Sequence, residues 1–315
     1  MDVWVLGRIG YDLYAVEHDI PLPEAKTFTR HLGGSSANIA VGLARLGVEV
    51  GIISAVGDDL MADYLLGFLK SENVDTRFVR RVAGYGTSLC LTEISKAHGF
   101  RQVFYRHRPA DSQVVFGREE AAAIGGARMF ITNGTSLQEG RSRDATTRAL
   151  TAAAQGGMQT VLDVDYRPSS WNSPQEAGAA ARGVLGNVRI VIANETEMDL
   201  LTATGTTAER AMAVLDAGPN IVVCKLGGKG VVAHTRERAE FVPPQPVEVV
   251  STIGAGDGFA SGFLYGVLSG RTLTDSLQLG NAAAAVVVSR VGCSDAMPYL
   301  YELEAPSRGT TAKSG

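Results

Sequence analysis

Short apolar segments alternate with amphipathic ones along most of the chain, and this alternation constrains the fold more than any other feature. Residues 36–46, 61–70 and 142–155 place apolar side chains at helical spacing. The segments between them predict short strands that are apolar on both faces, at residues 3–6, 50–54, 129–132, 160–164, 190–193 and 221–224. The pattern predicts an α/β fold, in which a mostly parallel sheet is covered by helices on both faces.

Two segments interrupt the alternation. Residues 11–32 show no helical period, and residues 84–108 contain two extended stretches, 88–94 and 102–105, joined by a turn near residues 96–99. These segments are either peripheral hairpins or a small β lid over a site at the carboxyl edge of the main sheet. We therefore expect a core of residues 1–10, 33–83 and 109–300, a lid of residues 11–32 and 84–108, and a frayed tail of residues 301–315.

Composition excludes several classes of protein. A chain of 315 residues can bury a large core without disulfides or structural metal, and its net charge of −4, with no basic run, argues against a nucleic-acid-binding surface. Cys90, Cys224 and Cys293 are too scattered for a zinc site or a disulfide framework. The longest apolar stretch, 282–288, is too short to cross a membrane, and the first residues resemble a strand more than a signal peptide. We expect a cytoplasmic protein.

The most informative motif is Gly254-Ala255-Gly256-Asp257. It lies between a Val-rich segment, 247–250, expected to be a strand, and an apolar helix expected at residues 259–268. A glycine-rich turn at a helix N-terminus presents unpaired N–H groups to an anion. The Asp257 carboxylate is either an N-terminal cap or a general base beside that anion site. The spacing matches neither the P-loop nor the dinucleotide-binding fingerprint, which needs glycine at Phe259.

A second glycine pair, Gly33-Gly34, precedes Asn38 in the first turn of the helix expected at residues 36–46. The glycines allow backbone to approach a ligand closely, and the amide of Asn38 can both donate to and accept from hydroxyl groups. The alternative is a tight loop before a capped helix. Asp12 follows the first expected strand, where a carboxylate is either a ligand-binding group or an ordinary turn residue.

Two further motifs follow expected strands. Asn194 and Glu197 are three residues apart, so they either form a capping box or hold Mg²⁺ and its waters through their oxygens. The segment from Lys225 through Gly227 to Gly230 either passes over nucleotide phosphates or forms a hairpin turn. Because the carboxyl ends of parallel strands share one edge of a sheet, all of these motifs are expected to meet there.

In this order and spacing, the motifs resemble those of the PfkB, ribokinase-like carbohydrate kinases, over roughly residues 2–300. The resemblance implies a ribokinase-like core with a β lid, and ATP-dependent phosphorylation of a primary hydroxyl group. It implies Asp257 as the base; Gly254, Ala255 and Gly256 around the anion hole; Asn194 and Glu197 at Mg²⁺, through water; Asn194, Lys225, Gly227, Gly230 and Asn281 at ATP; and Asp12, Gly33, Gly34 and Asn38 at the sugar.

Shorter segments narrow the resemblance. Residues 7–14, 162–168 and 292–298 resemble the 5-dehydro-2-deoxygluconokinases of inositol breakdown, and Phe104-Tyr105-Arg106 resembles these and the 2-keto-3-deoxygluconate kinases. Both groups act on sugar acids. Arg106 and Arg167 therefore either pair with a substrate carboxylate or form surface ion pairs.

Some features leave alternatives open. Residues 107–111 depart from the inositol-pathway pattern, so a 2-keto-3-deoxygluconate, neutral-sugar or nucleoside acceptor, or a non-catalytic sugar-binding regulator, remains an alternative. Ser251-Thr252-Ile253 stands where many ribokinases have Asp-Thr-Thr, so the resemblance does not predict a monovalent cation. Apolar residues expected on the lid surface predict a homodimer: Leu89, Leu91, Val103 and Phe104.

Overall fold

The computed structural model describes residues 1–95, 99–138, 140–202 and 204–304, and its main feature is a nine-stranded sheet. Its first seven strands in chain order pair in parallel, and the two strands at one edge are antiparallel. In their order across the sheet, the strands are β13 (Ala239–Val242), β12 (Val231–His234), β11 (Ile221–Lys225), β10 (Ile190–Asn194), β9 (Gln159–Asp163), β8 (Met129–Asn133), β1 (Val3–Leu6), β4 (Val50–Gly57) and β5 (Asp75–Val82).

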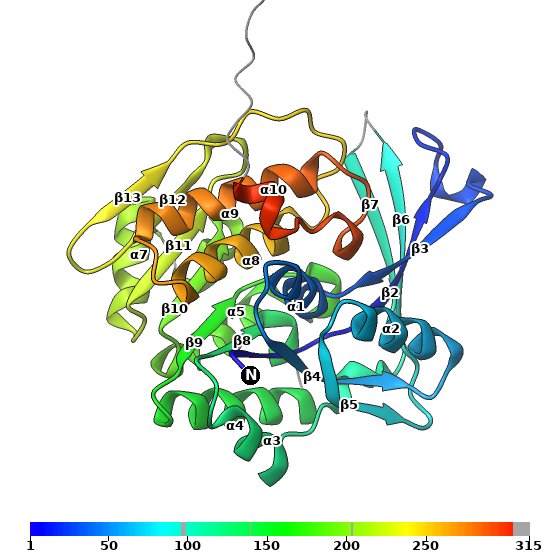
Figure 1. Cartoon of the computed structure of the whole chain (residues 1–315), viewed down its shortest axis with the longest axis horizontal. Coiled ribbons are helices and arrows are strands. Elements are labelled where there is room, and N and C mark those ends of the chain that lie inside the picture. Colours follow the sequence, from blue (N-terminus) through cyan, green and yellow to red (C-terminus); the bar gives the residue numbers. More distant parts are fainter. Residues whose placement is uncertain (96–98, 139, 203, 305–315) are drawn as a thin grey trace, which may run out of the picture.

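Helices cover both faces of this sheet, as the alternation predicts (Figure 1). In β1, Val3 and Val5 pack into one core with α1, α2, α8 and α9, whereas Trp4 and Leu6 pack into a second core on the opposite face. The helices are α1 (Ser35–Arg45), α2 (Leu60–Ser71), α3 (Arg118–Ile124), α4 (Arg141–Gln155), α5 (Pro174–Arg182), α6 (Glu195–Leu201), α7 (Thr207–Asp216), α8 (Ala255–Leu268), α9 (Leu273–Val288) and α10 (Leu300–Glu304).

A separate four-stranded sheet lies at one side of the core, in the order β3-β2-β6-β7 (Figure 1). Its strands are β2 (Gly10–Ala15), β3 (Phe28–Gly33), β6 (Ser88–Ser95) and β7 (Gly99–Tyr105). The turn expected near residues 96–99 falls largely on 96–98, outside the described residues. Of the expected tail, residues 301–304 belong to α10, and residues 305–315 are not described.

Two expectations differ from the structure. Residues 243–250 form no strand, because the chain leaves the sheet after Val242, and Val247 and Val249 instead line a cavity. The following helix, α8, begins at Ala255 and so includes Asp257 in its first turn. Phe104 also does not lie on the outer face of the small sheet. It pairs with buried Cys90 and faces inward, because side chains alternate along a strand.

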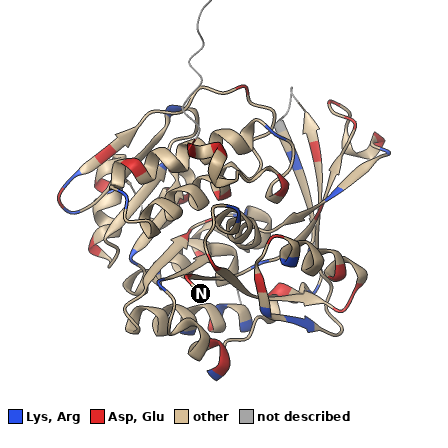
Figure 2. Ribbon diagram, in the orientation of Figure 1, with Lys and Arg blue, Asp and Glu red and all other residues tan. Residues whose placement is uncertain are grey.

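Charged residues of both signs are interspersed over the helices and strands (Figure 2). Among the described residues, no helix combines the length and apolar character that a membrane span requires.

Candidate active site

A cavity of about 980 Å³ lies between the small sheet, the carboxyl ends of β9, β10 and β11, and the first turn of α8. Gly33 and Arg106 are the two predicted site residues that do not line it. The cavity brings together all the others: Asp12, Gly34, Asn38, Arg167, Asn194, Glu197, Lys225, Gly227, Gly230, Gly254, Ala255, Gly256, Asp257 and Asn281.

Asp257 is the third residue of α8, and its carboxylate is held from two sides. Ser35 donates its hydroxyl to Oδ1 at 2.6 Å, and Asn38 donates its side-chain amide to Oδ2 at 2.7 Å. Both donors come from the first turn of α1, so the N-termini of two helices meet at this carboxylate. Asp257 is only 7% exposed, yet it lines the cavity. A fixed carboxylate at a cavity wall is the arrangement that a general base requires.

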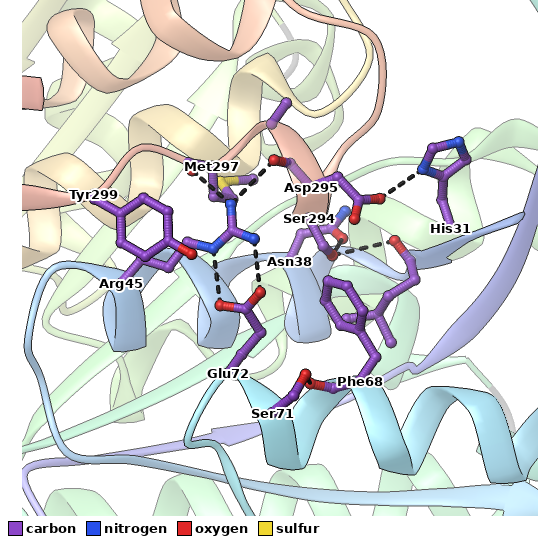
Figure 3. Close-up of polar contacts among 12 residues, drawn as sticks. His31, Asn38, Arg45, Phe68, Ser71, Glu72, Ser294, Asp295, Met297 and Tyr299 are labelled. Atoms are coloured by element: carbon purple, nitrogen blue, oxygen red, sulfur yellow. Dashed lines mark hydrogen bonds and ion pairs between the residues drawn. The ribbon is translucent and has the colours of Figure 1, made fainter. Parts of the chain in front are cut away.

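Asn38 is itself held in orientation by Ser294, in the short 3-10 helix η7 (Ser294–Ala296). The Ser294 hydroxyl donates to the side-chain oxygen of Asn38 at 2.6 Å. Because this bond fixes the oxygen of the amide, the amide nitrogen faces Asp257. Figure 3 shows how η7 is fastened against α1: Arg45 donates to the carbonyl oxygens of Asp295 and Met297 and pairs with Glu72. The segment 292–298 is noted in the sequence only for its resemblance, and the contact of Ser294 with Asn38 is not predictable from it, because 256 residues separate the two.

Burial raises the pKa of the Asp257 carboxyl above its ordinary value, and the nearby charge of Asp165 raises it further. The hydrogen bonds from Ser35 and Asn38 oppose this shift because they stabilise the charged form. A carboxylate with a raised pKa is a stronger base than an ordinary aspartate.

The first turn of α8 presents free donors beside Asp257. Gly254 caps the helix in the left-handed conformation, with a φ of 79°, and offers no side chain to the turn. The Ala255 N–H reaches Thr252 O at 3.3 Å, whereas among the described residues no acceptor is in place for the N–H groups of Gly256 and Asp257. These two donors lie at the positive end of a 14-residue helix, which favours an anion.

Lys225 adds a positive charge at the same place. Its Nζ lies 3.3 Å from Asp163 Oδ1 and would lie 3.3 Å from a Cβ atom added at Gly256. Asp163 and Glu197 hold the pKa of Lys225 above its usual range despite burial, so it remains charged. Burial raises the pKa of Asp163 to about 7 even though Lys225 opposes the shift. The family resemblance implies a position beside the nucleotide for Lys225 and no role for Asp163.

Asn194 and Glu197 form the capping box of α6. Asn194 Oδ1 accepts from the Glu197 N–H at 2.9 Å, and Glu197 Oε2 accepts from the Asn194 N–H at 2.7 Å. The other oxygen, Oε1, accepts from the Tyr166 N–H at 3.0 Å. The capping box, one of the two alternatives predicted for this pair, is therefore confirmed. Both side chains also line the cavity.

The end of the cavity under the small sheet carries Asp12 on β2 and Arg167 after β9. Gly33 does not line the cavity, but its missing side chain leaves room for Asp12, because a Cβ atom added at Gly33 would lie 2.2 Å from Asp12 Oδ1. Arg167 pairs with Asp165 at 3.0 Å and stays half-buried. Arg8, which the sequence analysis did not single out, lines the same end.

Arg106 departs from its expected position. Its Nη2 pairs with Asp111 Oδ2 at 2.6 Å and donates to Gln138 Oε1 at 3.1 Å. The guanidinium is thus drawn to the loop that follows the small sheet, and Arg106 is absent from the cavity wall.

The opposite end of the cavity is largely apolar. Val231, Ala284 and Val288 line it beside the segment 244–249. The 3-10 helix η6 (Gly227–Lys229) connects β11 to β12 as a hairpin and borders this end, as one reading of the sequence predicts. Asn281 on α9 donates to Pro243 O at 2.8 Å, which ties the segment to the helix.

Replacing Asp12 with Asn should change how stability depends on pH. Burial raises the pKa of Asp12 to about 6, so the folded protein retains a proton that the unfolded chain, with a pKa near 3.8, releases. This contribution to the free energy of unfolding is fully present below pH 4 and is lost as the pH rises through 6. Between pH 4 and 7, Asp12→Asn should therefore gain about 3 kcal/mol relative to wild type. Denaturant titrations of both proteins across this pH range test the prediction. A difference in the free energy of unfolding that does not change with pH would contradict the raised pKa of Asp12.

Comparisons with known proteins agree with this geometry. Residues 1–300 match the model of the pfkB family carbohydrate kinases. A 5-dehydro-2-deoxygluconokinase of Shouchella clausii is 33% identical over 308 residues, covering 96% of this chain and 94% of the relative. The Clostridium perfringens protein of the same name is 35% identical over 309 residues, covering 96% and 91%.

A solved structure gives the same result for the fold. A protein from E. coli assigned as a ribokinase II, in complex with ATP and Mg²⁺, superposes with a TM-score of 0.88 at 25% identity, covering 96% of this chain and 97% of the other. The fold is therefore ribokinase-like, and the match extends over both sheets of the chain. With a family match over residues 1–300 and relatives aligned along nearly their whole length, this chain belongs to the pfkB family of carbohydrate kinases.

Proposed function

We propose that this chain transfers the γ-phosphoryl group of ATP to the terminal hydroxyl group of 5-dehydro-2-deoxy-D-gluconate. One observation carries the proposal: the Asp257 carboxylate lies at the cavity wall, fixed by Ser35 and Asn38, beside the free N–H groups of the α8 N-terminus. A base next to an anion site suits phosphoryl transfer, in which catalysis is mostly positioning and charge stabilisation.

In this reaction Asp257 accepts the proton of the substrate hydroxyl group while the oxygen of that hydroxyl forms a bond to the γ-phosphorus. The bond from that phosphorus to the β–γ bridging oxygen breaks, and ADP leaves with the electron pair. The N–H groups of Gly256 and Asp257, with the Lys225 ammonium, stabilise negative charge on the phosphoryl oxygens. The apolar end of the cavity receives the adenine ring, and η6 borders the nucleotide. The small sheet acts as the lid that keeps water out.

Mg²⁺ fits this site as an ion that arrives with the nucleotide. Among the described residues, no three His, Cys, Asp or Glu side chains are grouped to hold a metal ion. Glu197 uses each oxygen for one backbone N–H but retains lone pairs, and with Asn194 it faces the cavity. These residues can therefore hold the waters that Mg²⁺ keeps around it. When bound, Mg²⁺ neutralises phosphate charge. The E. coli relative described above was solved with ATP and Mg²⁺.

The acceptor is proposed to be an acid for two reasons. The curated relatives described above are named for 5-dehydro-2-deoxygluconate. Arg167 also offers a charged, half-buried guanidinium at the end of the cavity under the small sheet. Guanidinium groups recognise carboxylates through paired hydrogen bonds.

A coupled assay of ADP release with a panel of acceptors tests the function. The panel contains 5-dehydro-2-deoxygluconate, 2-keto-3-deoxygluconate, ribose, fructose and adenosine, each with sodium and with potassium. We expect the first acid to give the highest kcat/KM, with no need for potassium, because Ser251 offers a hydroxyl where related kinases carry a carboxylate. A neutral acceptor that outperforms both acids would overturn the proposed substrate. Binding of sugar acid without any ADP release would indicate a regulator instead.

The outer face of the lid supports a proposed homodimer. Tyr105 and Val103 on β7 are 59% and 42% exposed, and they pair with Leu89 and Leu91 on β6. Such a continuous apolar face is expected to be covered by a second copy. Light scattering on the purified protein should give twice the mass of the chain, and a monomer at working concentration would contradict the proposal.

We also propose that the enzyme acts in the cytoplasm. ATP is available there, and Cys90, Cys224 and Cys293 are all buried free thiols, which suits a reducing compartment. Cell fractionation tests this, and recovery of the protein outside the cytoplasmic fraction would contradict it.

A further inference from the structure

Three guanidinium groups gather near the lid end of the cavity, and two of them already have carboxylate partners. Arg106 pairs with Asp111 at 2.6 Å, and Arg167 pairs with Asp165 at 3.0 Å. For the third, Arg8, the described part of the chain provides no carboxylate within ion-pair distance. Arg8 interacts electrostatically with the Asp12 carboxylate, whose pKa it lowers, but it differs from the other two in forming no direct ion pair.

Burial makes this unpaired charge costly. Arg8 is 8% exposed, and its Nε is buried without any hydrogen-bond partner among the described residues. The guanidinium lies over the ring of Phe104, 5.4 Å from the centroid, which favours the cation but accepts none of its N–H bonds. A buried guanidinium with an unsatisfied Nε and no direct ion pair is stabilised when an anion binds to it.

The backbone around Arg8 packs closely against neighbouring segments, and this packing fixes the position from which the side chain extends. Arg8 lies in the connection between β1 and β2. A Cβ atom added at Gly7 would lie 1.9 Å from Ser36 Oγ, and one added at Gly34 would lie 2.4 Å from the Arg8 carbonyl oxygen. Both glycines allow this connection to pack directly against the start of α1, which carries the contacts to Asp257.

We infer that Arg8 is the main anchor of the substrate carboxylate and determines the preference for sugar acids over neutral sugars, with Arg167 as the second donor. Both residues line the cavity, whereas Arg106 is turned away toward Asp111. The planar guanidinium of Arg8 can give a carboxylate two parallel hydrogen bonds. This inference rests on the proposed function and names the residue that makes it acid-specific.

The experiment compares two acceptors that differ only in charge: the sugar acid and its primary carboxamide. For the wild type, we expect kcat/KM to favour the acid. In Arg8→Gln, kcat/KM for the acid should fall roughly 30- to 100-fold, mainly through KM, while the value for the amide stays within threefold. Arg101→Gln, at an exposed position on β7, is the matched control and should change neither value.

The outcomes separate the inference from the function. If the wild type prefers the acid but Arg8→Gln loses the same factor on both acceptors, or loses nothing, the inference is wrong and the function stands. If the wild type uses the two acceptors equally, Arg8 confers no preference for acids, so the inference is wrong and the function stands. If the wild type uses neither acceptor, the proposed function fails and the inference fails with it. Should Arg8→Gln not fold, Arg8→Lys decides the matter: a loss confined to the acid supports the inference, and an equal loss on both acceptors overturns it.

Discussion

Asp257→Asn should lower kcat by about 10²- to 10⁴-fold while leaving KM for ATP nearly unchanged. The amide keeps the size of the carboxylate but cannot accept the hydroxyl proton, and it no longer accepts from both Ser35 and Asn38. Because the N–H groups of the α8 N-terminus remain, nucleotide binding should persist. Steady-state kinetics with saturating sugar acid measure the effect.

Asp275→Asn is the matched control for this variant. Asp275 is the third residue of α9, as Asp257 is of α8, and it is exposed. Both substitutions remove an acidic residue from a first helical turn, so any general effect on the helix is shared. Asp275→Asn should retain wild-type kcat. If Asp257→Asn kept activity within tenfold of wild type, Asp257 would not be the base.

Gly34→Ala should lower the free energy of unfolding by about 3 kcal/mol or more. Gly34 has a φ of 93°, and an added Cβ would lie 2.4 Å from the backbone oxygen of Arg8, which no side-chain rotation can relieve. The connection that carries Arg8 must therefore move, and KM for the sugar acid should rise together with the loss of stability. Denaturant unfolding and kinetics on the same preparation measure both effects.

Gly47→Ala separates the steric effect from backbone strain. Gly47 has a similar φ of 86°, but an added Cβ would meet no atom within 4 Å. This variant should lose only about 1 to 2 kcal/mol and keep its KM. If both variants lost the same free energy of unfolding, the contact between the added Cβ at Gly34 and the Arg8 backbone would contribute nothing to the loss.

The sequence predicts the core elements well because their signals are local. A strand buried on both faces and a helix with one apolar face are each defined within about a dozen residues. The helix expected at 36–46 is Ser35–Arg45, and the strand expected at 221–224 is Ile221–Lys225. The strand expected at residues 247–250 is wrong, because a run of β-branched residues does not reveal whether a neighbouring strand is available to pair with it.

The site was only partly predictable, for a related reason. The glycine motifs mark where backbone approaches a ligand, and they led to Asp257 and Asn38. The partners that orient these side chains come from distant segments: Ser294 reaches Asn38, and Asp163 pairs with Lys225 across 62 residues. For Arg106 the difference comes from a residue nearby in the sequence. The motif alone suggests that its side chain binds the substrate, but the guanidinium forms an ion pair with the Asp111 carboxylate instead.

A structure of the complex with 5-dehydro-2-deoxygluconate and a non-hydrolysable ATP analogue tests the central claim most directly. We predict that the terminal hydroxyl of the acid lies about 3 Å from a carboxylate oxygen of Asp257 and faces the γ-phosphorus. The γ-phosphate should lie against the N–H groups of Gly256 and Asp257. A complex in which that hydroxyl points away from Asp257, beyond hydrogen-bond reach, would contradict the account.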